Sequence, residues 1–142
     1  MKAWEVMTRM WGFHRSLGEE VFPELEKIGL FPMAPWLLAM VAEHHYPKAI
    51  LERVHLPAPT LSQMLRRLEA AGLVKRLMDQ ADLRRYRFEL TEKGKEAQEA
   101  GRRCYQQALE KRLARLSKTE RQEFARLLKI LASPAAGSGQ DQ

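Results

Sequence analysis

The sequence has little cysteine and no long apolar run, and each shortage excludes a class of protein. Its single cysteine, Cys104, cannot form a disulfide within the chain, which is typical of a reducing compartment. No uninterrupted apolar stretch approaches the roughly 18 residues that a membrane-spanning helix needs. The start of the chain, MKAWEVMTRM, lacks the continuous apolar segment of a secretory signal. We therefore predict a cytoplasmic protein that does not enter a membrane.

Motifs of catalysis and of metal binding are also missing. The chain has no G-x-x-x-x-G-K-[ST] loop, no G-x-S-x-G turn and no H-E-x-x-H pair. His44 and His45 are adjacent, so on a helix their side chains would point about 100° apart and would not chelate one ion together. The expected state of Cys104 is a buried, inert thiol. We predict no cofactor, no metal site and no enzymatic activity.

Positive charge is concentrated in the middle of the chain. The 142 residues, 45% hydrophobic and 30% charged, suit one globular domain with a net charge of +6. Residues 1–47 carry a net charge of −2, residues 48–87 carry +5 and residues 88–142 carry +3. This placement favours a polyanionic partner such as nucleic acid, and a solvated charged face is the alternative.

Apolar residues at spacings of three and four predict a mainly helical chain. Pro23 should kink or split the first helix, whereas Gly29 and Gly72 should end helices. Ser117 and Glu120 have the spacing of a capping box at the start of the last helix. The predicted helices cover residues 4–28, 33–41, 50–54, 59–71, 91–116 and 117–131.

The fifth of these helices carries a stripe of small residues, which would allow another helix to approach closely. The stripe consists of Gly94, Ala97, Gly101, Cys104 and Ala108. Before it, the period of the sequence changes from 3.6 to 2, which is typical of strands. Residues 74–78 and 86–90 should therefore pair as a hairpin with residues 79–85 at its tip.

The order of these elements resembles that of the MarR family of winged helix-turn-helix transcription regulators, over roughly residues 4–132. Three stretches carry the resemblance: TLSQMLRRLEAAGLV, DLRRYRFELTEKG and LSKTERQEFARLLKIL. The second is the most specific, because five of its residues fall in register with the family's wing: Asp82, Arg84, Leu90, Thr91 and Gly94. Leu83 departs from the pattern by replacing its first arginine, and Gln63 stands where many members have arginine.

The resemblance implies a mainly α fold, in which a winged helix-turn-helix with a small β-hairpin wing is flanked by N- and C-terminal helices of a dimerisation domain. The implied parts are residues 1–31 and 92–132 for dimerisation, 32–91 for DNA binding and a disordered tail at 133–142. The partners would be double-stranded DNA and a second copy of the chain.

Candidate DNA-binding residues fall into three groups. On the recognition helix they are Thr60, Ser62, Gln63, Arg66 and Arg67. Arg53, Arg67 and Lys75 are placed for phosphates, which fix register without reading sequence. On the wing they are Arg84 and Arg85, with Asp82 expected to hold Arg84 by an ion pair. An ordinary polar surface and a weak surface salt bridge are the alternatives.

The implied function is that of a sequence-specific regulator, a repressor that binds a pseudo-palindromic operator as a homodimer. Many members of the family bind a small aromatic effector between the two domains. Here Trp11, His14, Trp36, Met40 and His44 could line such a pocket, or simply belong to the core. Two other functions stay open: an architectural DNA-binding protein without effector, and a winged helix that docks an acidic protein partner.

Overall fold

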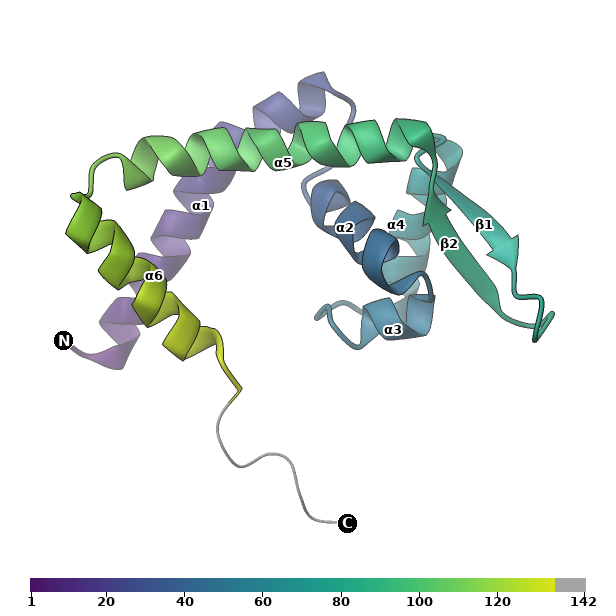
Figure 1. Cartoon of the computed structure of the whole chain (residues 1–142), viewed down its shortest axis with the longest axis horizontal. Coiled ribbons are helices and arrows are strands. Elements are labelled where there is room, and N and C mark those ends of the chain that lie inside the picture. Colours follow the sequence, from purple (N-terminus) through teal and green to yellow (C-terminus); the bar gives the residue numbers. More distant parts are fainter. Residues whose placement is uncertain (135–142) are drawn as a thin grey trace, which may run out of the picture. The chain divides into compact units, whose positions relative to one another are not determined.

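A computed structural model describes residues 1–134 of the chain (Figure 1). Within these residues six helices accompany one hairpin, as the sequence predicts. The elements are α1 (Ala3–Lys27), α2 (Ala34–His44), α3 (Pro47–Leu51), α4 (Ala58–Ala70), β1 (Val74–Met78), β2 (Tyr86–Leu90), α5 (Glu92–Leu113) and α6 (Lys118–Ala132). The tail predicted to be disordered, 133–142, lies outside the described residues except for Ser133 and Pro134.

The chain divides into two compact units, Met1–Ala108 and the residues from Leu109 onward. Pro23 lies inside α1, which is one uninterrupted helix and is not split. None of the helices among residues 1–134 is long and apolar enough to cross a membrane.

The core of the first unit forms where α2, α3, α4 and the hairpin meet. It is built from aliphatic residues that recur at helical spacing, because only one stripe of each helix is apolar. Its fully buried side chains include Leu37, Leu38 and Val41 of α2, Ile50 of α3 and Leu68 of α4. Phe88 of β2 closes the core from the hairpin side.

Two glycines end helices as predicted. Gly29 and Gly72 have φ angles of +75° and +74°, in the left-handed region that favours glycine. After α4, the Gly72 N–H donates to the Glu69 carbonyl and the Leu73 N–H to the Leu68 carbonyl. This turn directs the chain from α4 straight into β1, and so sets where the hairpin begins.

The small-residue stripe of α5 packs against its own chain. A Cβ atom on Gly94 would lie 1.9 Å from the carbonyl oxygen of Leu73, and one on Gly101 would lie 2.7 Å from Cγ of Pro35. The stripe therefore provides the predicted close approach within the first unit, where α5 lies on the start of α2 and on the turn before β1. A partner chain is not needed to explain it.

Thr91 caps α5 and joins it to the end of α4. Its hydroxyl accepts from the Gly94 N–H at 3.0 Å and donates to the Gly72 carbonyl at 2.6 Å, while its N–H donates to the Leu73 carbonyl at 3.1 Å. The hairpin, α4 and α5 are thus joined at one junction.

The predicted capping box of α6 is also present, with both Ser117–Glu120 bonds formed.

The hairpin has the predicted register, with Val74 opposite Leu90 and Met78 opposite Tyr86. Its second strand also bonds to the turn between α2 and α3. The Phe88 N–H donates to the His45 carbonyl at 2.7 Å, and His45 Nδ1 lies 3.1 Å from the Phe88 carbonyl oxygen. The hairpin is therefore held on its outer edge as well as by its own ladder.

Candidate nucleic-acid interface

The exposed face of α4 carries the polar residues that the sequence predicts. Leu61, Leu65 and Leu68 recur at spacings of four and three and form the buried side of the helix, whereas Ser62, Gln63 and Arg66 are exposed. Thr60 is half-buried at the start of the helix. Side chains that can donate or accept hydrogen bonds therefore share one open surface.

Arg66 lies on this face without an acidic partner among the described residues. Its Nε donates to the Ser62 carbonyl at 3.4 Å, which leaves the rest of the guanidinium in solvent. Arg67 differs, because its guanidinium lies 4.7 Å from the centre of the Phe31 ring. Arg67 is thus held at the flank of the helix, where the sequence also places it.

The two phosphate candidates have different surroundings. Arg53, just after α3, donates to the Ala49 carbonyl at 2.9 Å and is exposed. Lys75 on β1 lies 3.9 Å from the Glu89 carboxylate on the paired strand. Its charge is partly compensated, so Arg53 is the stronger cationic site of the two.

Arg84 at the hairpin tip is almost fully exposed. Its side chain is 93% exposed, with Nε 3.5 Å from Oδ1 of Asp82. The same carboxylate oxygen accepts from the Arg84 backbone N–H at 3.0 Å. The contact expected between Asp82 and Arg84 is therefore present, in a geometry that leaves the guanidinium in solvent.

Arg85 does not share the setting of its neighbour. Its guanidinium lies 4.4 Å from the centre of the Tyr46 ring, and the Tyr46 hydroxyl donates to Asp79 at 3.2 Å. Neither Tyr46 nor Asp79 is among the candidates predicted from the sequence. In the sequence, Tyr46 and Pro47 indicate only the interruption of a helix. No local pattern links Tyr46 to Asp79, which is 33 positions away.

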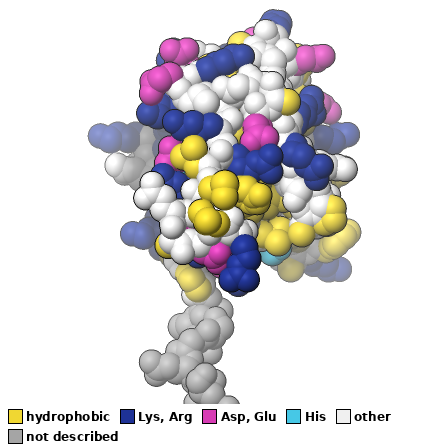
Figure 2. All heavy atoms as spheres, turned by 90° about the vertical axis from the view of Figure 1, so that its right-hand side faces the viewer, with side chains coloured by type: hydrophobic (Ala, Val, Ile, Leu, Met, Phe, Trp, Pro, Cys, Tyr) yellow, Lys and Arg dark blue, Asp and Glu magenta, His cyan; other side chains and the backbone are white. Residues whose placement is uncertain are grey.

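Figure 2 faces the end of the molecule that carries the hairpin, and shows Lys and Arg side chains spread over it around a smaller group of hydrophobic ones. Three exposed hydrophobic side chains belong to the hairpin: Met78, Leu83 and Tyr86. A surface with basic residues and few acids is suited to a polyanion.

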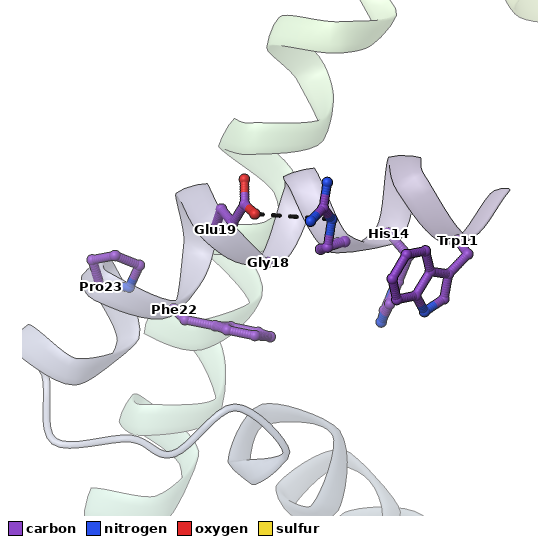
Figure 3. Close-up of a pocket in the computed structure, with 7 residues that line it drawn as sticks. Trp11, His14, Gly18, Glu19, Phe22 and Pro23 are labelled. Atoms are coloured by element: carbon purple, nitrogen blue, oxygen red, sulfur yellow. Dashed lines mark ion pairs between the residues drawn. The ribbon is translucent and has the colours of Figure 1, made fainter. Parts of the chain in front are cut away.

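The predicted effector residues are only partly brought together. Trp11 and His14 line an open hollow of about 460 Å3 along α1, with Arg15, Gly18, Glu19, Phe22 and Pro23 (Figure 3). Trp36, Met40 and His44 lie on α2 and do not line it. Trp36 instead packs on Tyr105 of α5, with ring centres 5.4 Å apart. Among the described residues no cluster of His, Cys, Asp and Glu could hold a metal ion.

An exposed polar helix that leads directly into a hairpin with an exposed arginine at its tip defines a winged helix-turn-helix protein. Residues 28–85, which contain α4, β1 and the tip of the hairpin, match the model of the MarR family. None of the curated proteins matches the chain.

Solved structures of regulators have the same fold. The Staphylococcus aureus MepR–DNA complex is 23% identical, with a TM-score of 0.75, and the match covers 94% of this chain and 100% of that one. The transcriptional regulator SlyA is 23% identical, with a TM-score of 0.77 and coverages of 89% and 90%. The Mycobacterium tuberculosis MarR family protein Rv2887, in complex with p-aminosalicylic acid, is 24% identical, with a TM-score of 0.74 and coverages of 94% and 100%.

Residues 28–85 thus match the MarR family by sequence, and the chain as a whole shares the fold of these solved structures.

Proposed function

We propose that this protein is a cytoplasmic, homodimeric repressor that binds a pseudo-palindromic DNA operator through α4 and the wing. The observation that carries the proposal is the joint exposure of Gln63 and Arg66 on α4 and of Arg84 on the hairpin of the same compact unit. The family match and the MepR–DNA complex support it.

In this proposal α4 lies in the major groove, which is wide enough for a helix and presents a distinct pattern of donors and acceptors for each base pair. Ser62, Gln63 and Arg66 face the base edges, with Thr60 at the entrance of the helix. Arg53, Arg67 and Lys75 lie toward the phosphates and fix the position of the helix. Arg84 at the wing tip enters the narrow, electronegative minor groove.

The dimer is proposed to use the terminal parts of the chain, residues 1–31 and 92–132, around the DNA-binding part at 32–91. Helix α6 has no buried residue, yet its apolar side chains include Phe124, Leu127, Leu128 and Leu131. Helix α1 likewise exposes Trp4, Met7 and Trp11. Such faces are typical of subunit interfaces, and a two-fold axis would place two recognition helices about one DNA turn apart.

We also propose that a small aromatic ligand releases the protein from its operator. The hollow on α1 offers two aromatic rings, Trp11 and Phe22, and a histidine that can form hydrogen bonds, His14 (Figure 3). The p-aminosalicylic acid complex of Rv2887 supports a ligand of this kind.

The test is a selection of binding sites from random duplex DNA, followed by affinity measurements with the enriched duplex and a scrambled one. Enrichment of an inverted repeat and a preference of about 1000-fold over the scrambled duplex are expected of a sequence-specific regulator. Equal binding to both duplexes would indicate the architectural alternative, and no binding to either would indicate the protein-docking alternative. Transcription from the gene's own upstream region, with and without the protein, tests repression.

Gln63→Ala and Arg66→Ala are expected to change which base pairs are preferred, because both side chains lie on the open face of α4. Each good bidentate base contact provides about 1–3 kcal/mol of discrimination, so preference at one operator position should fall by roughly tenfold or more. Repeating the site selection with each variant measures this. Parental preferences in both variants would show that another surface reads the DNA.

Arg84→Ala is expected to weaken binding about equally at operators that differ only in major-groove positions, because the minor groove has no unique base code. The slope of log affinity against log salt should decrease by roughly one unit. Asp82→Ala should copy part of the loss although it removes a negative charge, because Asp82 holds Arg84. Affinities across a salt series measure both effects. Tighter binding by Asp82→Ala would contradict the holding role.

A further inference from the structure

We propose that Tyr46, Asp79 and Arg85, here called the wing anchor, set the position of the wing on the DNA, and that Arg85 acts through this anchor and does not itself bind DNA. The inference rests on the proposed function, because the wing is what the anchor positions.

The anchor joins the tip of the hairpin to the turn between α2 and α3. Oδ2 of Asp79 accepts from the Tyr46 hydroxyl at 3.2 Å, and the guanidinium of Arg85 lies 4.4 Å from the centre of the Tyr46 ring. Within the hairpin, the Asp79 N–H donates to the Arg85 carbonyl at 3.0 Å. One aromatic side chain thus contacts the residues at both ends of the tip loop.

Both carboxylate oxygens of Asp79 accept hydrogen bonds within this part of the structure. Its Oδ1 accepts from the Ala81 N–H at 2.9 Å while Oδ2 serves Tyr46. The hydrogen bond from the Ala81 N–H lowers the pKa of Asp79 most, burial opposes this effect, and the Tyr46 hydroxyl and the Arg85 charge lower the pKa further. Asp79 is therefore ionised throughout the neutral range, and the anchor does not depend on pH there.

The residue before Tyr46 holds the same hairpin at a second point. His45 has a φ of 59°, a left-handed conformation that few non-glycine residues adopt, and its backbone and ring both bond to Phe88. One short turn therefore contacts β2 through His45 and the hairpin tip through Tyr46. Two contacts fix the direction of a two-stranded hairpin better than one, because the hairpin cannot pivot about either alone.

The two adjacent arginines of the tip consequently have different settings. Arg84 is 93% exposed and touches only its neighbour Asp82, whereas Arg85 lies over an aromatic ring of the helical part. If Arg85 left Tyr46 to reach DNA, the cation–π contact would be lost. Only the hydrogen bond from Tyr46 to Asp79 would then join the hairpin tip to Tyr46.

The sign of one substitution separates positioning from direct contact. Asp79→Ala removes a negative charge beside DNA, so electrostatics alone predicts tighter binding. The wing anchor predicts the reverse, a loss of about threefold to tenfold, because the hydrogen bonds that Asp79 accepts from Tyr46 and Ala81 no longer hold the tip. Glu52→Ala is the matched control, since Glu52 is an exposed acid within the DNA-binding part and forms no ion pair with the anchor among the described residues. It should leave affinity unchanged or raise it.

Tyr46→Ala should weaken binding of the selected operator by a similar factor, and adding Arg84→Ala should then cost little more, because both changes remove the contact of the wing. Tyr46→Phe keeps the ring beneath Arg85 and should restore most of the loss. If Arg85 binds DNA directly, Tyr46→Ala frees it and affinity should stay equal or increase. That result, or tighter binding by Asp79→Ala, would overturn the inference.

A measurement without DNA keeps the inference separate from the proposed function. In the free protein, NMR signals of the Arg85 side chain should be shifted by the Tyr46 ring, and the shift should vanish in Tyr46→Ala and persist in Tyr46→Phe. A protein that shows this shift but binds no DNA would refute the proposed function and leave the contact intact. Absence of the shift in the unsubstituted protein would refute the anchor itself.

Discussion

Replacing Leu127 by aspartate is expected to convert the protein from a dimer to a monomer at micromolar concentration. Leu127 lies in the exposed apolar face of α6 and is 43% exposed, so a carboxylate at this position can reach solvent in the monomer. A two-fold interface contains every residue twice, so one substitution places two carboxylates in an apolar contact. Sedimentation velocity measures the change.

Operator affinity should fall with the dimer. A monomer binds one half-site and loses the effective concentration that the second half-site provides, typically a factor of about 100 or more. Gln122→Asp is the matched control, because Gln122 lies on the opposite side of α6 and its substitution should leave both dimer and affinity intact. A Leu127→Asp variant that remains a dimer would assign the interface to another surface.

Gly94→Ala is expected to lower the free energy of unfolding by about 3 kcal/mol, which is large for the addition of one methyl group. The new Cβ would lie 1.9 Å from the Leu73 carbonyl oxygen, a backbone atom that also accepts from the Thr91 N–H. The carbonyl cannot move aside without breaking the junction of α4, α5 and the hairpin. Alanine's better helix propensity offsets only about 1 kcal/mol of this cost.

Urea unfolding at one fixed protein concentration measures the effect. Gly12→Ala is the control, because Gly12 is also a helical glycine and a Cβ there would meet nothing within 4 Å. It should raise stability by about 0.5–1 kcal/mol. A change of less than about 0.5 kcal/mol in Gly94→Ala would mean that α5 does not approach Leu73 so closely.

Local patterns were enough to predict the elements of this fold. Alternation of apolar residues predicted the hairpin register, and the capping box at Ser117 and Glu120 predicted where α6 begins. The polar face of α4 followed from the spacing of Leu61, Leu65 and Leu68. In each case the cause lies within one turn or one strand pair, so the sequence contains it.

Contacts between distant segments were not predictable in the same way. The wing anchor joins residues 33 positions apart, and nothing in the local sequence distinguishes Arg85, which lies over the Tyr46 ring, from Arg84, which contacts only Asp82. The small-residue stripe was recognised as a contact surface, but only the structure identifies what it contacts, which is Leu73 and Pro35 of the same chain. The hollow on α1 contains only two of the five predicted effector residues. The prediction failed for the other three because helical spacing does not show which helix packs beside another.

The glycines of α5 have a mechanical consequence. Within the first unit, α5 packs closely against Leu73 at Gly94 and against Pro35 at Gly101. These two glycines are seven residues apart, a separation of about 10 Å along the helix axis. A helix packed closely at two points cannot rotate about either one alone. We therefore expect α2, α4 and the hairpin to move together with the first turns of α5 as one rigid body. Any torque applied to that part of α5 would therefore turn α4 directly, without bending an intervening joint.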